Sequence, residues 1–197
     1  MDFELTEKLG ELLMQDKVDE AISTAEAKLR QHTKTDFNKI LGRDLLNLSD
    51  DFADYIDEFY TKVNSRITVK AIYCEMNGFT INPDLWFLDL FAFDNFGGTE
   101  DFDWLADWEQ ENCSKQSFII SGYEDIQSVY ESYMEKESWK NEVESTGHGI
   151  CELLVVLRLQ ELMKATFKLG RQKGQRWTTV PVLVTAHDYY DMVYKVE

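Results

Sequence analysis

The chain has few cysteines and almost no proline. Its 197 residues include three cysteines and two prolines, whereas 44% are hydrophobic and 13% are aromatic. Cys74, Cys113 and Cys151 are an odd number without paired spacing, which argues against a disulfide-stabilised scaffold and predicts free thiols. With so little proline and glycine, long linkers are not expected. Length and composition predict a single α+β domain over residues 1–197, with 1–48 as a helical appendage in an alternative division.

A basic leader and a long apolar run are also missing. The first residues, MDFELTEKLGELL, are acidic and amphipathic, unlike a signal peptide. The longest apolar stretch, residues 150–163, is interrupted by Glu152, Arg158 and Glu161. It therefore predicts a buried helix rather than a membrane span. Together with the unpaired cysteines, these features predict a cytoplasmic protein of bacterial character.

The sequence lacks the short motifs that mark metal and nucleotide sites. It contains no HExxH motif, no CxxC pair, and no glycine-rich turn leading from a strand into a helix. Glu100, Asp101 and Asp103 cluster as oxygen ligands do, but the glycine and distal glutamate of a calcium loop are absent. No metal and no cofactor is therefore expected. The net charge of −17 also disfavours nucleic acid and anionic membranes as partners.

Hydrophobic periodicity predicts helices at the start of the chain. Apolar residues spaced three and four apart predict helices over 5–13 and 18–29, a third after Thr35, and a fourth that begins at Ser49 and runs to Val63. Later, a long central buried helix is expected from Ile150 to Leu169, with Gly147 and Gly149 before it and Gly170 as its C-terminal signal.

The period changes from 3.6 to 2 near the middle of the chain. Residues 67–73 alternate between apolar and polar, and the apolar run Leu85–Phe93 follows a turn sequence, so two adjacent antiparallel strands are expected. The second run is apolar on both faces, which predicts a central strand. Shorter strands are expected near 117–120 and 180–184. This order of elements predicts an α+β fold with N-terminal helices and a mostly antiparallel sheet.

Five polar residues are weak candidates for catalysis. Asp89 interrupts an apolar strand, where a carboxylate is expected to be buried and paired with a hydrogen-bond donor. His148 lies three residues before Cys151, and such a pair is the minimum for nucleophilic catalysis if the two side chains meet in space. Asp94 and His187 complete the set. A structural role is the alternative at each position, and we lean against an enzyme.

Charge is distributed unevenly along the sequence. Between Ala71 and Ser114 there are ten acidic residues and no lysine or arginine. Residues 93–111, which we call the acidic aromatic segment, interleave seven of these acids with tryptophan and phenylalanine. Exposed aromatic side chains anchor interfaces, and acidic ones steer basic partners. The predicted partner-binding residues are Asp101, Asp103, Trp104, Asp107 and Trp108; the alternative is a solvated loop whose aromatic rings fold back into the core.

A cluster of basic residues lies near the C-terminal end of the sequence, far from the acidic aromatic segment. Lys164, Lys168, Arg171, Lys173 and Arg176 lie in a stretch without acids. They would suit a helix C-terminus, a phosphate, or the acidic surface of the same chain. The leading hypothesis is a non-catalytic protein that docks or neutralises a basic protein partner, for example a toxin-neutralising immunity protein. The alternatives are a small enzyme and a structural subunit of a larger assembly.

Overall fold

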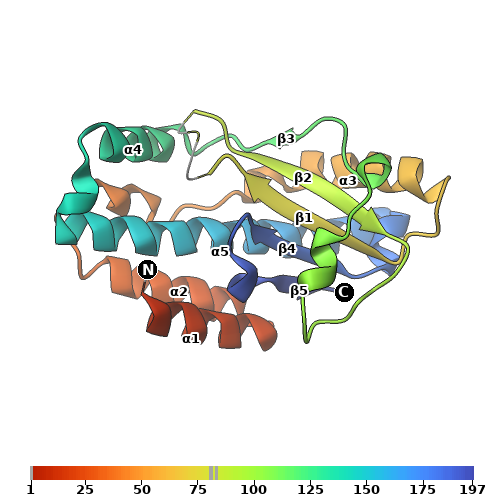
Figure 1. The fold of residues 1–197 in the computed structure, drawn as a ribbon, viewed down its shortest axis with the longest axis horizontal. Helices are drawn as coiled ribbons and strands as arrows, with labels where there is room; N and C mark the ends of the chain where they lie inside the picture. Colours follow the sequence, from red (N-terminus) through yellow and green to blue (C-terminus); the bar gives the residue numbers. More distant parts are fainter. Residues whose placement is uncertain (1, 80–81, 83) are drawn as a thin grey trace.

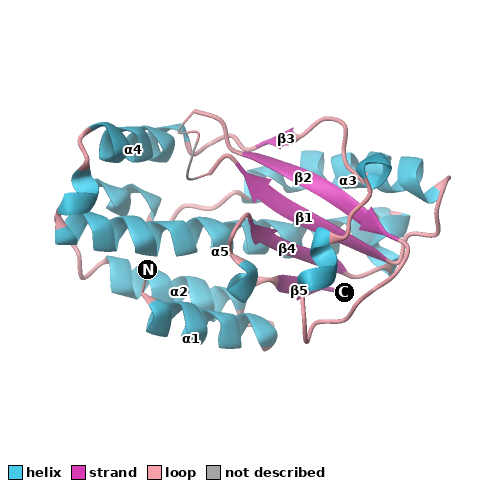
Figure 2. Cartoon of the chain, viewed as in Figure 1, coloured by secondary structure: helices cyan, strands magenta, loops and turns pink. Residues whose placement is uncertain are grey.

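A computed structural model of the protein describes residues 2–79, 82 and 84–197 (Figures 1 and 2). Its main elements are α1 (Phe3–Met14), α2 (Val18–Leu29), α3 (Ser49–Asn64), β1 (Ala71–Asn77), β2 (Phe87–Phe93), β3 (Phe118–Ile119), α4 (Glu124–Glu135), α5 (Glu142–Lys173), β4 (Val182–Ala186) and β5 (Tyr194–Val196). Short 3-10 helices connect them, including η1 (Asp36–Ile40), η3 (Asp103–Ala106), η6 (Arg176–Thr179) and η7 (Tyr190–Met192).

The strands form one sheet in the order β3-β2-β1-β4-β5. β1 and β2 are antiparallel, with Ala71 opposite Phe93 and Asn77 opposite Phe87. β1 and β4 are parallel, whereas the pairs β2/β3 and β4/β5 are antiparallel. The parallel pair needs a long crossover, which contains α4 and α5. The predicted α+β fold with a mostly antiparallel sheet is confirmed, although the central strand is β1 and not the run at 85–93.

Helix α5 is the centre of the molecule. Between Ile150 and Met163 every residue is buried except Glu152 and Glu161. α2, α3 and β4 all pack against it, and Figure 1 shows it behind the sheet, parallel to the long axis of the molecule. A helix that is apolar on all sides must be covered on all sides. The predicted long central buried helix is therefore confirmed.

The limits of α5 differ from those predicted. The helix begins at Glu142, where Asn141 Oδ1 accepts the N–H groups of Val143 and Glu144. Gly147 lies inside it: a Cβ there would come within 2.7 Å of the Thr35 side chain. This glycine therefore permits a close approach and does not end a helix. The C-terminal signal is Gly174, with φ +72°, and not Gly170.

Two other predicted elements are shorter in the structure. The segment after Thr35 forms only η1, in which the Thr35 hydroxyl accepts the N–H of Phe37 at 3.3 Å. β1 begins at Ala71 instead of Ile67, because β2 and β4 offer pairing partners only from Ala71 and Ile72 onward. The apolar–polar alternation therefore starts a few residues before the strand itself, because the first residues have no partner strand to pair with.

A partly buried ion pair joins the N-terminal helices to α5. Arg158, only 8% exposed, contacts Glu26 of α2 at 2.7 Å and Glu161 at 2.8 Å. Glu26 also accepts the N–H of Gly42 and an N–H of Arg30. A guanidinium among apolar neighbours needs such partners, because an unpaired buried charge is strongly unfavourable. The same main core includes apolar residues of α1, α2 and the sheet.

Replacing Leu154 or Leu157 with alanine should lower the free energy of unfolding by about 2–5 kcal/mol, because each side chain is fully buried and would leave a cavity. Denaturant unfolding followed by circular dichroism measures this loss. Met134 on α4 is 52% exposed, so Met134→Ala is the control, with an expected change below about 0.5 kcal/mol. A loss below about 1 kcal/mol at both leucines would contradict the central role of α5.

Candidate functional site

The two faces of the sheet differ in character. On one face, Ile72, Cys74 and Met76 of β1 join the main core with the helices. The alternate residues point the other way, where Tyr73 and Leu183 belong to a second, smaller core. We call that side the outer face. The acidic aromatic segment crosses it in front of the strands (Figure 1).

Aromatic rings hold the acidic aromatic segment on the outer face. Trp104 packs edge-on against Phe93 and Phe96, with ring centroids 5.0 and 5.7 Å apart. Trp108 packs on Phe91 of β2 at 5.3 Å. Trp108 nevertheless keeps 47% of its surface exposed, and Phe96 keeps 38%. The rings therefore anchor the segment and still present apolar surface to solvent.

Two glycines let the segment turn back over Trp104. A Cβ at Gly97 would overlap the indole ring, so no larger residue fits there without a shift. Gly98 has φ +93°, a conformation that glycine adopts without strain. Its carbonyl accepts the Trp104 Nε1–H at 3.2 Å. The turn and the tryptophan therefore stabilise each other.

The acidic side chains of the segment all point into solvent. All seven are exposed, and none forms an ion pair with any described residue: Asp94, Glu100, Asp101, Asp103, Asp107, Glu109 and Glu111. Uncharged groups supply their hydrogen bonds, as where Asp101 Oδ1 accepts the N–H of Asp103 at 2.8 Å. The segment is thus a band of carboxylates without ion pairs to described residues, supported by aromatic rings; the Arg66 guanidinium reaches only the main-chain carbonyl of Glu111.

Asp89 lies half-buried on the outer face of β2. Its Oδ1 accepts the Ser117 hydroxyl at 2.7 Å and the Ser114 hydroxyl at 3.5 Å, and its Oδ2 accepts Asn77 Nδ2 at 3.1 Å. The predicted hydrogen-bond donors are therefore present. The prediction that Asp89 is fully buried on a central strand is wrong. β2 is second from the edge of the sheet, and β3 pairs with it only at Phe87 and Leu88.

Glu75, which the sequence pattern did not single out, lies next to two of the candidate residues on the outer face. It lies directly opposite Asp89 in the β1/β2 register and is only 9% exposed. Its carboxylate accepts the Tyr73 hydroxyl at 2.8 Å and lies 3.2 Å from Nδ1 of His187. Burial raises the pKa of Tyr73, and the Glu75 carboxylate adds to this effect. Continuing the alternation of residues 67–73 by two residues would have placed Glu75 on the same face as Tyr73.

His148 and Glu152 form a second polar pair, on α5. His148 Nε2 lies 3.4 Å from Glu152 Oε1, and its ring stacks on Tyr133 with centroids 4.3 Å apart. Burial lowers the pKa of His148 to about 4. Burial raises the pKa of Glu152 to about 7, although a hydrogen bond with Tyr189 opposes this shift. At neutral pH the imidazole is therefore uncharged and the carboxyl group is partly protonated.

The five candidate catalytic residues lie in three separate places. Asp89 and His187 flank Glu75 on the outer face. His148 and Cys151 are near the start of α5, but Cys151 is fully buried, and burial raises the pKa of its thiol to about 12. This shift opposes formation of a nucleophilic thiolate. Asp94 is exposed at the end of β2. The three cysteines are free, as predicted.

No protein-family model, curated protein or solved structure matches this chain. Within the described residues, no group of three or more histidine, cysteine, aspartate or glutamate side chains is arranged to hold a metal ion. In that same part of the chain, no helix has both the length and the apolar character of a membrane span.

Glu152→Gln should change how stability depends on pH. A carboxyl group whose pKa rises from 4.5 to about 7 on folding stabilises the protein at low pH, and this contribution is lost as pH rises through that range. Glutamine imitates the protonated form and cannot ionise. The variant should therefore gain about 2–3 kcal/mol relative to the wild type between pH 4.5 and pH 8.

Urea unfolding at several pH values measures this gain, with Glu131→Gln on the exposed side of α4 as the control. A difference between Glu152→Gln and the wild type that does not vary with pH would contradict the buried, protonated carboxyl group.

Proposed function

We propose that this chain is a non-catalytic binding protein that docks a basic protein partner on the acidic aromatic segment. The observation that carries the proposal is the combination of seven exposed acids, none of them ion-paired within the part of the chain that the structure describes, with aromatic rings that fix them on the sheet. Unneutralised charge on an ordered support is available to a partner and needs little rearrangement to bind it.

The rings and the acids have different parts in this proposal. Acidic side chains steer a basic surface toward the segment, which mainly raises the association rate. Trp108, half exposed over Phe91, then supplies apolar area that can be buried in the complex. Trp104 is less exposed, and its contacts with Phe93 and Phe96 support the segment itself. Trp108 is therefore the better candidate for an anchor.

A toxin-neutralising immunity protein of the bacterial cytoplasm is the most concrete form of this proposal. A net charge of −17 on 197 residues suits the capture of a basic protein. Free thiols suit a reducing compartment. An enzyme has less support, because the candidate catalytic residues are dispersed and Cys151 is not activated. A structural subunit finds no specific support in the geometry.

Replacing Asp101, Asp103 and Asp107 with asparagine should slow association with the partner severalfold and flatten its salt dependence, because long-range steering is lost. The partner is the protein that co-purifies with the wild type from the native host. Stopped-flow binding at two salt concentrations gives the association rate. The matched control changes Glu58, Glu131 and Glu135 to glutamine, three exposed acids of α3 and α4 that lie outside the segment.

Trp108→Ala should instead accelerate dissociation, because an anchor acts after the complex has formed. Normal association of the triple asparagine variant, with its salt dependence intact, would refute docking on this segment. The segment would then be a solvated loop held down by its rings.

A further inference from the structure

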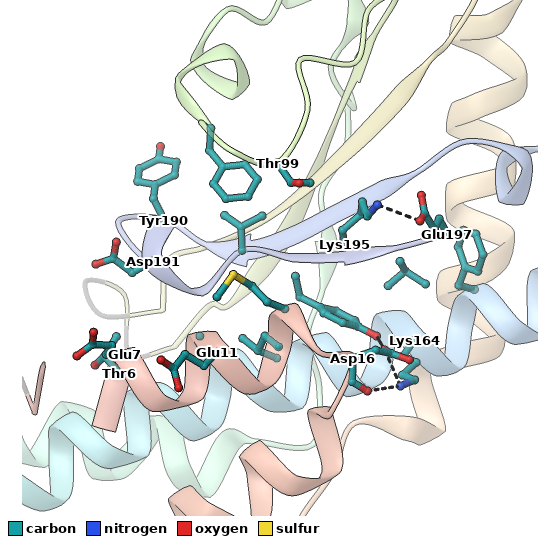
Figure 3. A pocket seen from close by; sticks show the side chains of 18 of the residues that line it. Thr6, Glu7, Glu11, Asp16, Thr99, Lys164, Tyr190, Asp191, Lys195 and Glu197 are labelled. Carbon is teal, nitrogen blue, oxygen red and sulfur yellow. Dashed lines mark hydrogen bonds and ion pairs between the residues drawn. The ribbon is translucent and has the colours of Figure 1, made fainter. Parts of the chain in front are cut away.

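A large open groove runs along β5 at the edge of the sheet (Figure 3). Its volume is about 1430 Å³. Figure 3 shows β5 as the floor, with α1 on one side and the loop that carries Thr99 on the other. None of the five candidate catalytic residues lines it. The groove is therefore a feature separate from the polar pairs of the outer face and α5.

The floor of the groove is an open sheet edge. β5 pairs with β4 on one side, and no described strand pairs with its other side. An edge of this kind presents main-chain donors and acceptors to whatever lies beside it. Proteins that recognise extended peptides use such an edge to add one strand from the ligand. Lys195 in the middle of β5 is held by Glu197 at 2.9 Å.

The walls of the groove carry apolar side chains on both sides of that edge. Met14 of α1 and Phe167 of α5 line the helical wall, and Met14 is 82% exposed. Phe102 and Tyr190 line the opposite wall, and Tyr190 is 45% exposed. Because successive side chains of a strand point to opposite sides, a strand added to β5 would place alternate residues against each wall.

The two ends of the groove carry opposite charge. Glu7, Glu11 and Asp191 lie together at one end (Figure 3). Lys168 and Arg171 line the groove at the other end, beyond Lys164 on α5. None of these five forms an ion pair with a described residue, whereas Lys164 is paired with Asp16 at 2.7 Å.

We propose that the groove binds an extended peptide segment of a protein partner, which adds to the open edge of β5 and has basic residues at the end beside Glu7, Glu11 and Asp191. Alternating apolar side chains of the peptide fill the two walls, and an acidic group at its far end meets Lys168 and Arg171. A second copy of this chain is a poorer occupant. Its β5 is flanked by the same two walls, so the walls of the two copies would collide before their β5 strands could pair. This inference goes beyond the proposed function and can fail separately from it, although Phe102 of the acidic aromatic segment forms part of one wall.

Selection of random twelve-residue peptides on the immobilised full chain tests the inference. The enriched peptides should share alternating apolar residues with lysine or arginine at one end. The tightest of them, synthesised with a fluorescent label, is then the probe for affinity by fluorescence polarisation. Hydrogen exchange should show that this peptide protects the main-chain amides of residues 193–197, as an added strand does. Absence of enriched peptides, or protection elsewhere only, would overturn the proposal.

Charge reversal locates the basic end of the peptide. The double change Glu7→Lys and Glu11→Lys should weaken binding of the probe by about tenfold or more, because like charges would then face each other. The control, Glu131→Lys with Glu135→Lys on α4, changes the net charge equally and should leave binding unchanged. Equal weakening by both pairs would reduce the effect to overall charge and overturn the proposed orientation.

The triple asparagine variant of Asp101, Asp103 and Asp107 separates this inference from the proposed function. It should bind the peptide as the wild type does, even if it no longer binds a basic protein. Because Phe102 of the same segment forms part of one wall, the outcome that would place the peptide on the acidic aromatic segment and refute a site in the groove is loss of peptide binding in that variant together with no protection of residues 193–197 in the wild type. Size-exclusion chromatography without peptide gives the oligomeric state, and a dimer abolished by a Val193→Arg change in the groove would favour a second copy as the occupant.

Discussion

The burial of α5 on all sides is the constraint on which the rest of the structure depends. A helix whose residues 150–163 are apolar nearly all round cannot lie at a surface, so α2, α3 and the inner face of the sheet must cover it. For the same reason, the charged residues within this stretch are forced into an apolar environment. Arg158 pairs with Glu26 and Glu161, and Glu152 is pushed toward its protonated form. The core therefore fixes both the packing and the chemistry of its few polar groups.

The outer face of the sheet is free from that constraint, and the candidate sites are found there. No α-helix of the described residues covers this side; the acidic aromatic segment, with its short 3-10 helix η3, lies over it and is held there by aromatic rings. Beyond those rings, Asp89 and His187 keep part of their surface exposed, whereas Glu75 is buried. Glu75, Asp89 and His187 are near one end of this face, and the open edge of β5 lies at its side.

Charge is also distributed unevenly over the folded chain. Several cations are neutralised by acids of the same chain: Lys173 by Asp50 and Asp54, and Arg43 by Asp125. Individually, such exposed pairs contribute little to stability. They matter for binding, because these cations are taken up by acids elsewhere in the chain, whereas residues 71–114 contain ten acids and no lysine or arginine. A basic partner would therefore find its attraction concentrated at the acidic aromatic segment.

The sequence by itself determined the fold class, the central helix and the free thiols. These follow from composition and from the spacing of residues along the chain, and both can be read without knowing which distant residues touch. It also located the acidic aromatic segment, since an absence of lysine and arginine over residues 71–114 is visible without a structure. Only the tertiary structure decided what needed contacts between distant residues. Gly147 allows close packing against Thr35 and does not mark a helix boundary. Glu75 lies opposite Asp89 in the strand register and contacts His187. Cys151 is buried, whereas a nucleophile needs access to solvent. The groove beside β5 belongs to this second group, because its walls come from α1, α5 and the acidic aromatic segment, which only folding brings together.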